Sequence, residues 1–149
     1  SGDDLLTWPG AAPAQIRTWI AAAVRDLCRV AAPGRSLPTQ LKILAWANAN
    51  RAGDSNAAHE HANHSWSGVY YVSTGGGDGA AGLGSLELRD PRSGAGRINV
   101  GLSALGASHL IAPQPGLMVV FPSWLLHAVR PHAGPELRIS VAFNVMELP

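Results

Sequence analysis

The sequence predicts a mainly β domain preceded by one amphipathic helix, and three observations lead to this fold class. After residue 40, apolar and polar residues alternate repeatedly, which is the period of strands with one buried face. The chain has 17 glycines and 11 prolines, a composition that suits many short strands joined by turns. Only one segment, before residue 32, has apolar residues at helical spacing. We therefore expect a single domain over 1–149, with a helical segment over 1–36 and a barrel of strands over 37–149.

The N-terminal segment has the pattern of a helix that packs one face against a core. Its apolar residues recur at helical spacing, and arginines occupy other faces. These apolar residues are Ile16, Ile20, Ala23, Val24, Leu27 and Ala31. Pro13 opens the segment, and Pro33 with Gly34 ends it. We expect one helix over 13–31, packed on the outside of the barrel.

The rest of the chain is predicted to consist of strands and glycine-rich turns. The expected strands lie near 40–48, 66–74, 83–89, 97–101, 107–112, 117–122 and 136–146. The glycines over 75–84 form a loop, and they do not make a phosphate site, because no P-loop lysine or following helix accompanies them. The loops 49–58, 75–82 and 91–96 are expected to determine substrate specificity.

The strongest alternation lies over residues 136–146. Its apolar positions are Leu137, Ile139, Val141, Phe143 and Val145, and its even positions are Arg138, Ser140, Ala142 and Asn144. An arginine grips a carboxylate through two parallel hydrogen bonds, and a hydroxyl two residues along the same face supports the same anion. The polar face is therefore predicted to line a ligand cavity, with a face turned to water as the plainer alternative.

A histidine cluster accompanies this strand. His59 and His61 project to the same side of an extended backbone, so both imidazoles can reach one metal ion while Glu60 points away. His127 follows a β-rich run and can supply a third ligand. Three imidazoles suit iron, copper, nickel or zinc and leave positions for substrate and oxygen. This spacing alone is moderately specific, because His-x-His pairs also arise in loops without a metal.

Several of these motifs together, in this order, resemble the 2-oxoglutarate/Fe(II) oxygenases, in particular small bacterial and phage-encoded relatives of the prolyl hydroxylases. The motifs are WAN at 46–48, HEHAN at 59–63, SGVYYV at 67–72, DPR at 90–92, PG at 115–116, FPSWL at 121–125, His127 and RISVAFN at 138–144. The resemblance covers roughly residues 40 to 146, and the run of motifs is far more specific than any one of them.

The resemblance implies a fold, a set of cofactors and a reaction. The fold is a double-stranded β-helix, also called a jelly roll, as in the cupins. His59, His61 and His127 would hold Fe(II), and Arg138 with Ser140 would bind the distal carboxylate of 2-oxoglutarate. The implied reaction is hydroxylation of an unidentified small molecule or peptide by dioxygen, with release of succinate and CO2.

Further side chains are candidates for contact with the cosubstrate. Tyr70 and Tyr71 point to opposite faces of a strand, so at most one of them can offer its hydroxyl, and the sequence does not distinguish them. Asn48 and Asn144 are candidate polar lining residues. The remaining histidines are expected on the surface or in turns, with His64 near the mouth of the site; they are His64, His109 and His132.

One feature departs from the wider superfamily. A carboxylate usually stands two residues after the first histidine, and this chain has His61 there. A neutral third ligand leaves the site one unit more positive, which weakens retention of a hard divalent ion but still permits iron. Glu60 is the alternative third ligand.

Composition limits the partners. The net charge is +1 and only 14% of residues are charged, so no basic block indicates a nucleic-acid partner. No apolar stretch reaches the roughly 20 residues of a membrane span. Cys28 is the only cysteine, which excludes an intrachain disulfide and makes the cytoplasm the expected location.

Two other functions remain open at this point. One is a cupin-like enzyme whose three histidines bind a metal without 2-oxoglutarate, and Arg138 with Ser140 argues against it. The other is a catalytically silent barrel that acts as a binding or assembly module, and the intact histidine set argues against that.

Overall fold

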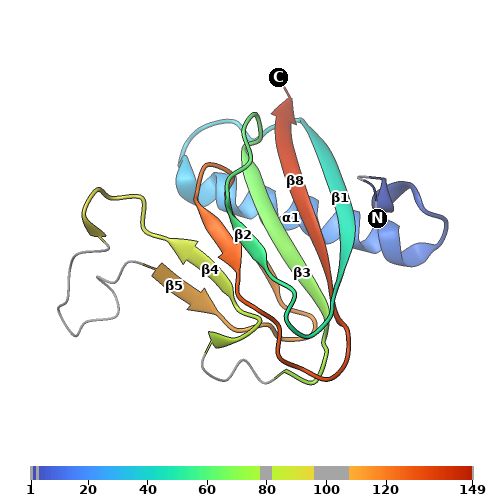
Figure 1. The fold of residues 1–149 in the computed structure, drawn as a ribbon. Coiled ribbons are helices and arrows are strands. Elements are labelled where there is room, and N and C mark those ends of the chain that lie inside the picture. The colour runs from blue at the N-terminus through green and yellow to red at the C-terminus, as the bar shows by residue number, and fades with distance from the viewer. Residues whose placement is uncertain (1, 3, 78–81, 96–107, 149) are drawn as a thin grey trace.

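The computed structural model describes residues 2, 4–77, 82–95 and 108–148. A 3-10 helix, η1 (Leu5–Thr7), and one long helix, α1 (Ala11–Ala31), precede the strands. The strands are β1 (Gln40–Asn50), β2 (Asn56–His59), β3 (Trp66–Thr74), β4 (Leu86–Arg89), β5 (Ser108–Ile111), β6 (Met118–Pro122), β7 (His127–Val129) and β8 (Arg138–Leu148). Figure 1 shows their arrangement.

The strands form two antiparallel sheets of four. The first sheet has the order β1-β8-β3-β6, and the second has the order β2-β7-β4-β5. The chain passes back and forth between the two sheets, except from β4 to β5, which are neighbours in the second sheet. Residues of both sheets line one cavity between them. This arrangement is a double-stranded β-helix, so the predicted fold class is confirmed.

Helix α1 covers the outer face of the first sheet (Figure 1). Ile20 and Val24 are fully buried, and they pack in one cluster with apolar residues of β1 and β8. The cluster consists of Leu5, Leu6, Ile20, Val24, Ala45, Val141, Phe143 and Val145. The odd-numbered residues of β8 therefore pack into the core beneath α1. The even-numbered residues of β8 lie on the opposite face of the sheet.

The helix begins at Ala11, two residues before the expected start at Pro13. A proline is tolerated in the first turn because the backbone N–H groups there have no helical acceptor. Gly10 precedes the helix with a φ of 115°, a conformation that only glycine adopts at little cost.

Two strands were not predicted. Strand β2 begins inside the stretch 49–58 that was expected to be a loop and ends at His59, and β1 also extends into this stretch as far as Asn50. Strand β7 has only three residues. Strands this short contain too few positions for alternation to be recognised. The expected strand over 83–89 is confined to Leu86–Arg89, and the one over 97–101 lies outside the described residues.

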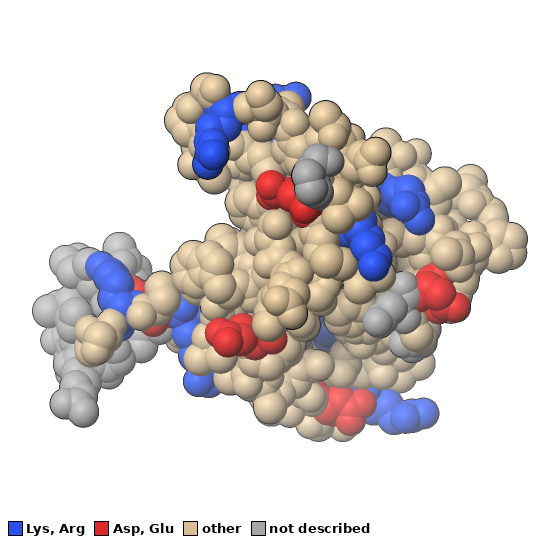
Figure 2. Space-filling model, turned by 90° about the horizontal axis from the view of Figure 1, so that it is seen from above, with Lys and Arg blue, Asp and Glu red and all other residues tan. Residues whose placement is uncertain are grey.

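Charged side chains are spread out on the face of the molecule that Figure 2 shows. In the view of Figure 2, lysines and arginines lie apart from one another, often beside an acidic residue, and they form no broad patch of one sign. None of the described helices is long and apolar enough to cross a membrane.

Candidate metal and cosubstrate site

The three predicted histidines lie together. A ligand atom from each of His59, His61 and His127 falls within 4.8 Å of the other two. Strand pairing explains the relative position of two of the three histidines, because His59 of β2 lies directly opposite His127 of β7 in the second sheet. His61 comes from the turn after β2, and its ring centroid is 4.9 Å from that of His59 and 5.2 Å from that of His127.

Backbone carbonyls orient two of the three imidazoles. Nδ1 of His59 lies 2.7 Å from the carbonyl oxygen of Ala57, and Nδ1 of His127 lies 2.8 Å from that of Leu125. A carbonyl only accepts, so Nδ1 carries the proton in both rings and Nε2 keeps its lone pair. Metal-binding histidines are commonly oriented in this way, by a hydrogen bond from the nitrogen that does not bind the metal.

The pKa values of two of the three histidines, His61 and His127, are shifted toward the neutral form. Burial lowers the pKa of His61 to about 4, and repulsion from His59, His127 and His64 adds to this effect. Burial also lowers the pKa of His127, although its hydrogen bond to Leu125 opposes the shift. Neutral imidazole is the form that binds a metal ion.

Arg138 is a buried cation without a carboxylate partner in the described part of the chain. Its side chain is 2% exposed, and Nη1 donates to Oδ1 of Asn50 at 3.1 Å and more weakly to Oγ of Ser140 at 3.5 Å. Its Nε is buried and has no hydrogen-bond partner among the described residues. Burial lowers the pKa of Arg138, which expresses the cost of a charge that lacks a counter-ion.

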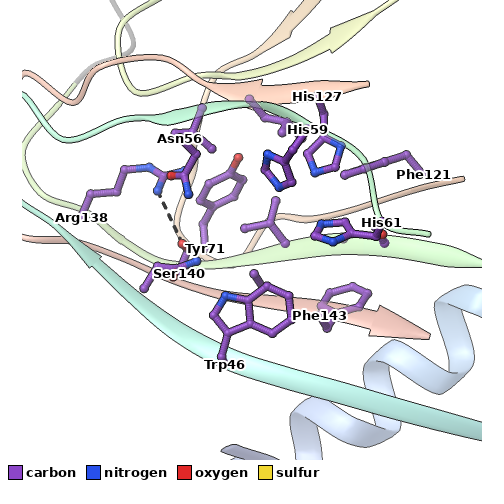
Figure 3. Close-up of a pocket in the computed structure, with 17 residues that line it drawn as sticks. Trp46, Asn56, His59, His61, Tyr71, Phe121, His127, Arg138, Ser140 and Phe143 are labelled. Carbon is purple, nitrogen blue, oxygen red and sulfur yellow. Dashed lines mark hydrogen bonds between the residues drawn. The ribbon is translucent and has the colours of Figure 1, made fainter. Parts of the chain in front are cut away.

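Tyr71, and not Tyr70, faces the cavity. Tyr71 is fully buried, its ring centroid lies 5.1 Å from Cζ of Arg138, and its hydroxyl lies near that guanidinium but has no acceptor among the described residues. Figure 3 shows its ring between Arg138 and the histidines. Tyr70 is on the helix side of the same strand, with its ring 5.7 Å from that of Trp19. The candidate role of Tyr70 in cosubstrate binding therefore does not fit its position.

One cavity between the sheets connects these groups. The three histidines, Tyr71, Arg138 and Ser140 all line it, and no described lining residue is acidic. Strands β1 and β8 form the wall of the cavity opposite His59 and His127. In the register of these two strands, Asn48 pairs with Ser140 and Asn50 pairs with Arg138. Asn48 lines the cavity as expected.

Some candidate residues lie elsewhere. Asn144 is buried but does not line the cavity, and its Oδ1 accepts a hydrogen bond from Oγ of Ser67 at 2.7 Å. Glu60 is exposed and does not belong to the group of possible ligands. His64 also lies outside the cavity lining, with Nδ1 2.9 Å from the carbonyl of Ala62 and a buried Nε2 that lacks a partner among the described residues. His132 is buried rather than on the surface.

The sequence analysis did not single out Asn56, which lines the cavity, or Asn50, which binds Arg138. A signal for Asn50 exists in the sequence, because Trp46, Asn48 and Asn50 alternate with alanines and so share one face of β1. Asn56 gives no such signal, since it belongs to the short strand β2.

The model of one protein family matches most of the chain. The model of a family described as "Putative 2OG-Fe(II) oxygenase" matches residues 44–144. None of the curated proteins compared with the chain matches it.

Solved structures share the fold at low sequence identity. An oxidoreductase of the 2OG-Fe(II) oxygenase family from Burkholderia pseudomallei is 15% identical with a TM-score of 0.62, and the match covers 91% of this chain and 58% of that one. A prolyl-4-hydroxylase from Pseudomonas putida is 17% identical with a TM-score of 0.62, over 95% and 71% of the two chains. A prolyl hydroxylase from Trichoplax adhaerens, in complex with a hypoxia inducible factor peptide fragment, is 14% identical with a TM-score of 0.58, over 91% and 58%.

Proposed function

The chain belongs to the 2OG-Fe(II) oxygenase family, and from this premise we propose that it is a dioxygenase that uses Fe(II), 2-oxoglutarate and dioxygen to hydroxylate a substrate. Succinate and CO2 are the proposed by-products. The observation that carries the proposal is a buried arginine without a counter-ion in the same cavity as three histidines.

The histidines fit an Fe(II) ion. Their ligand atoms lie close enough to share one ion, two of the rings are fixed with Nε2 free, and burial lowers the pKa of His61 and of His127. Three imidazoles also bind other first-row metals, so these ligands alone do not select Fe(II). The choice of Fe(II) also rests on membership of the family.

Arg138 and Tyr71 fit the far carboxylate of 2-oxoglutarate. A buried guanidinium with a free Nε lacks the anion that would compensate its charge, and the hydroxyl of Tyr71 lacks an acceptor. A carboxylate between them would accept from both side chains, and Ser140 could support it from the same face of β8. The described cavity wall offers no acidic side chain that competes for these donors.

Bound Fe(II) with 2-oxoglutarate and dioxygen supplies the oxidising chemistry, in which 2-oxoglutarate becomes succinate and CO2 and one oxygen atom enters the substrate. The protein binds and aims these groups. Arg138 fixes one end of the cosubstrate, and the three histidines fix the metal at the other. Apolar walls formed by residues such as Leu86, Phe121 and Val129 limit the access of water.

The substrate and the location of the protein belong to the proposal as well. We take the substrate to be a small molecule or a peptide, and the described loops carry no feature that selects between them. A cytoplasmic location is supported by the single cysteine, which cannot form an intrachain disulfide.

The decisive experiment is anaerobic addition of Fe(II) and then 2-oxoglutarate to the purified protein. We expect the weak visible charge-transfer band of their chelate, and we expect His61→Ala to lose both bound iron and the band. His109→Ala is the matched control, because His109 is an exposed histidine on β5. Iron binding without the band would favour a three-histidine enzyme that does not use 2-oxoglutarate. Absence of metal binding would favour a silent barrel.

A further inference from the structure

The turn that carries His61 is held by the backbone of one residue, Ser123. The amide of His61 donates to the carbonyl of Ser123 at 3.0 Å, and the amide of Ser123 donates to the carbonyl of Ser65 at 3.1 Å. Ser123 therefore fastens both ends of the turn 61–65. The amide of Ser65 in turn donates to the carbonyl of Val145 in β8 at 2.8 Å.

His61 depends on this backbone attachment more than the other two histidines do. His59 and His127 lie on paired strands, and carbonyls orient their rings. The ring of His61 has no hydrogen-bond partner within the described part of the chain, and its residue belongs to no strand. Its imidazole lies edge-on to Trp46, with ring centroids 6.3 Å apart, so the backbone attachment and this ring contact together set its position.

The side chain of Ser123 is itself anchored inside the barrel. Its Oγ lies 2.9 Å from Oγ of Ser67 in β3, and the same Oγ of Ser67 lies 2.7 Å from Oδ1 of Asn144 in β8. An amide oxygen only accepts, and Ser67 has a single hydroxyl proton, so Ser67 donates to Asn144 and accepts from Ser123. All three side chains are buried, where a hydroxyl without a partner is costly.

We propose that Ser123, Ser67 and Asn144 form a positioning network that places His61 for metal binding. The network joins β3, β8 and the turn that follows β6 to the turn that supplies the third ligand. It is uncharged, so it can fix the ligand without altering the charge of the site. Asn144 then acts through hydrogen bonds at a distance from the cavity, instead of touching the cosubstrate.

The metal-binding part of this inference rests on the proposed function, so its test starts with metal-free protein. Amide hydrogen exchange by NMR should show the His61 amide exchanging about 10-fold faster in Ser123→Ala than in wild type, since the side-chain anchor is lost. Ser85→Ala is the matched control: Ser85 is 1% exposed and Ser123 is 0% exposed, but Ser85 precedes β4 and does not contact the turn.

The second readout is the affinity and visible spectrum of Co(II), used as a probe of the histidine site. Substitutions around metal ligands commonly cost 10–100-fold in metal affinity, and we expect roughly 10-fold for Ser123→Ala with a changed Co(II) spectrum. Ser123→Cys retains a weak donor and should recover part of both effects. Ser85→Ala should match wild type in affinity and spectrum even if it lowers stability.

The outcomes separate the two proposals. Unchanged His61 exchange and unchanged Co(II) affinity in Ser123→Ala, with stability reduced as in Ser85→Ala, would mean that the network is only structural. If wild type binds no metal, the proposed function fails, and the exchange measurement still decides whether the network holds His61. If Ser123→Ala does not fold, Ser123→Cys must show the same shifts at smaller size.

Discussion

Arg138 is the residue on which the choice of cosubstrate depends. A three-histidine barrel without 2-oxoglutarate has no need for a buried guanidinium that lacks a carboxylate partner among the described residues. Such a charge is expensive to bury, and an anionic ligand is a straightforward way to compensate it. The side chain therefore points to a carboxylate-bearing molecule in the cavity.

Replacing Arg138 should weaken 2-oxoglutarate binding without removing the metal. Arg138→Ala leaves the far carboxylate unpaired in a buried site, so we expect a loss on the order of 2–5 kcal/mol in cosubstrate affinity. Arg138→Lys should recover only part of the loss, because a point charge cannot reproduce the two-pronged contact. Succinate formation against 2-oxoglutarate concentration measures the effect. The same concentration dependence in wild type and Arg138→Ala would refute the cosubstrate assignment.

The two neighbouring tyrosines provide an internally controlled test. Tyr71→Phe removes a buried hydroxyl that faces the cavity, and a hydrogen bond to a charged group contributes about 1.5–3 kcal/mol. We expect a corresponding rise in the 2-oxoglutarate concentration needed for turnover. Tyr70→Phe, on the helix side of the same strand, should leave that concentration unchanged. Equal effects of the two substitutions would show that the hydroxyl of Tyr71 does not contact the cosubstrate.

At this scale the sequence indicated most of the site but not its arrangement. Residue type and spacing singled out the three histidines, Arg138 and Ser140, because each carries chemistry that few other residues supply. The choice between Tyr70 and Tyr71 needed the register of β3 against β8, in which Tyr71 lies opposite Ser140 and Tyr70 opposite Val141. A residue-by-residue reading contains no information on that pairing.

At the scale of elements, the predictable strands are long and the unpredicted ones are short. Strand β8 has eleven residues, and its alternation identified both its core face and its cavity face. Strands β2 and β7 have four and three residues, yet their pairing brings His59 opposite His127. The element that makes the metal site is therefore formed by tertiary pairing, which local sequence patterns do not encode.

An ion pair links β4 to the end of β7, and it gives a testable pH dependence. Partial burial raises the pKa of Glu87, but the guanidinium groups of Arg130 and Arg89 outweigh this effect and hold it below its usual value. Nε of Arg130 lies 3.0 Å from Oε2 of Glu87. A carboxyl group with a lowered pKa stabilises the folded state at neutral pH, and this contribution is lost as pH falls through its folded pKa.

We therefore expect wild type to lose more free energy of unfolding than Glu87→Gln between pH 7 and pH 3. The difference should be about 0.5–1 kcal/mol, because the Arg130 side chain is 39% exposed and solvent screens the pair. Denaturant unfolding at both pH values measures it. Glu136→Gln is the control, since Glu136 is exposed and makes no ion pair within the described residues. If Glu87→Gln leaves the pH dependence of the free energy of unfolding unchanged, the ion pair does not contribute to the stability of the protein.

At the scale of the whole molecule, the cavity lies between the two sheets, and side chains from the facing surfaces of both sheets line it. Even residues of β8 and alternate residues of β1 form one wall, and residues of β2, β4 and β7 form the other. Helix α1 stabilises the first wall from outside. The chain spans 58% of the length of the Burkholderia oxidoreductase and 71% of that of the Pseudomonas prolyl-4-hydroxylase.

Because both sheets contribute to the site, ligands should stabilise the whole fold and do so in a fixed order. Metal at 100 times its dissociation constant adds about 2.7 kcal/mol to the free energy of unfolding, which corresponds to a rise in Tm of roughly 5–10 °C for a chain of this size. We expect 2-oxoglutarate to raise Tm further only when metal is present, since its two ends need both the metal and Arg138. Anaerobic thermal unfolding measures both steps. Arg138→Ala should keep the first rise and lose the second, whereas His61→Ala should lose both. An equal rise with 2-oxoglutarate in metal-free protein would place the binding site away from the histidines and contradict the proposed arrangement.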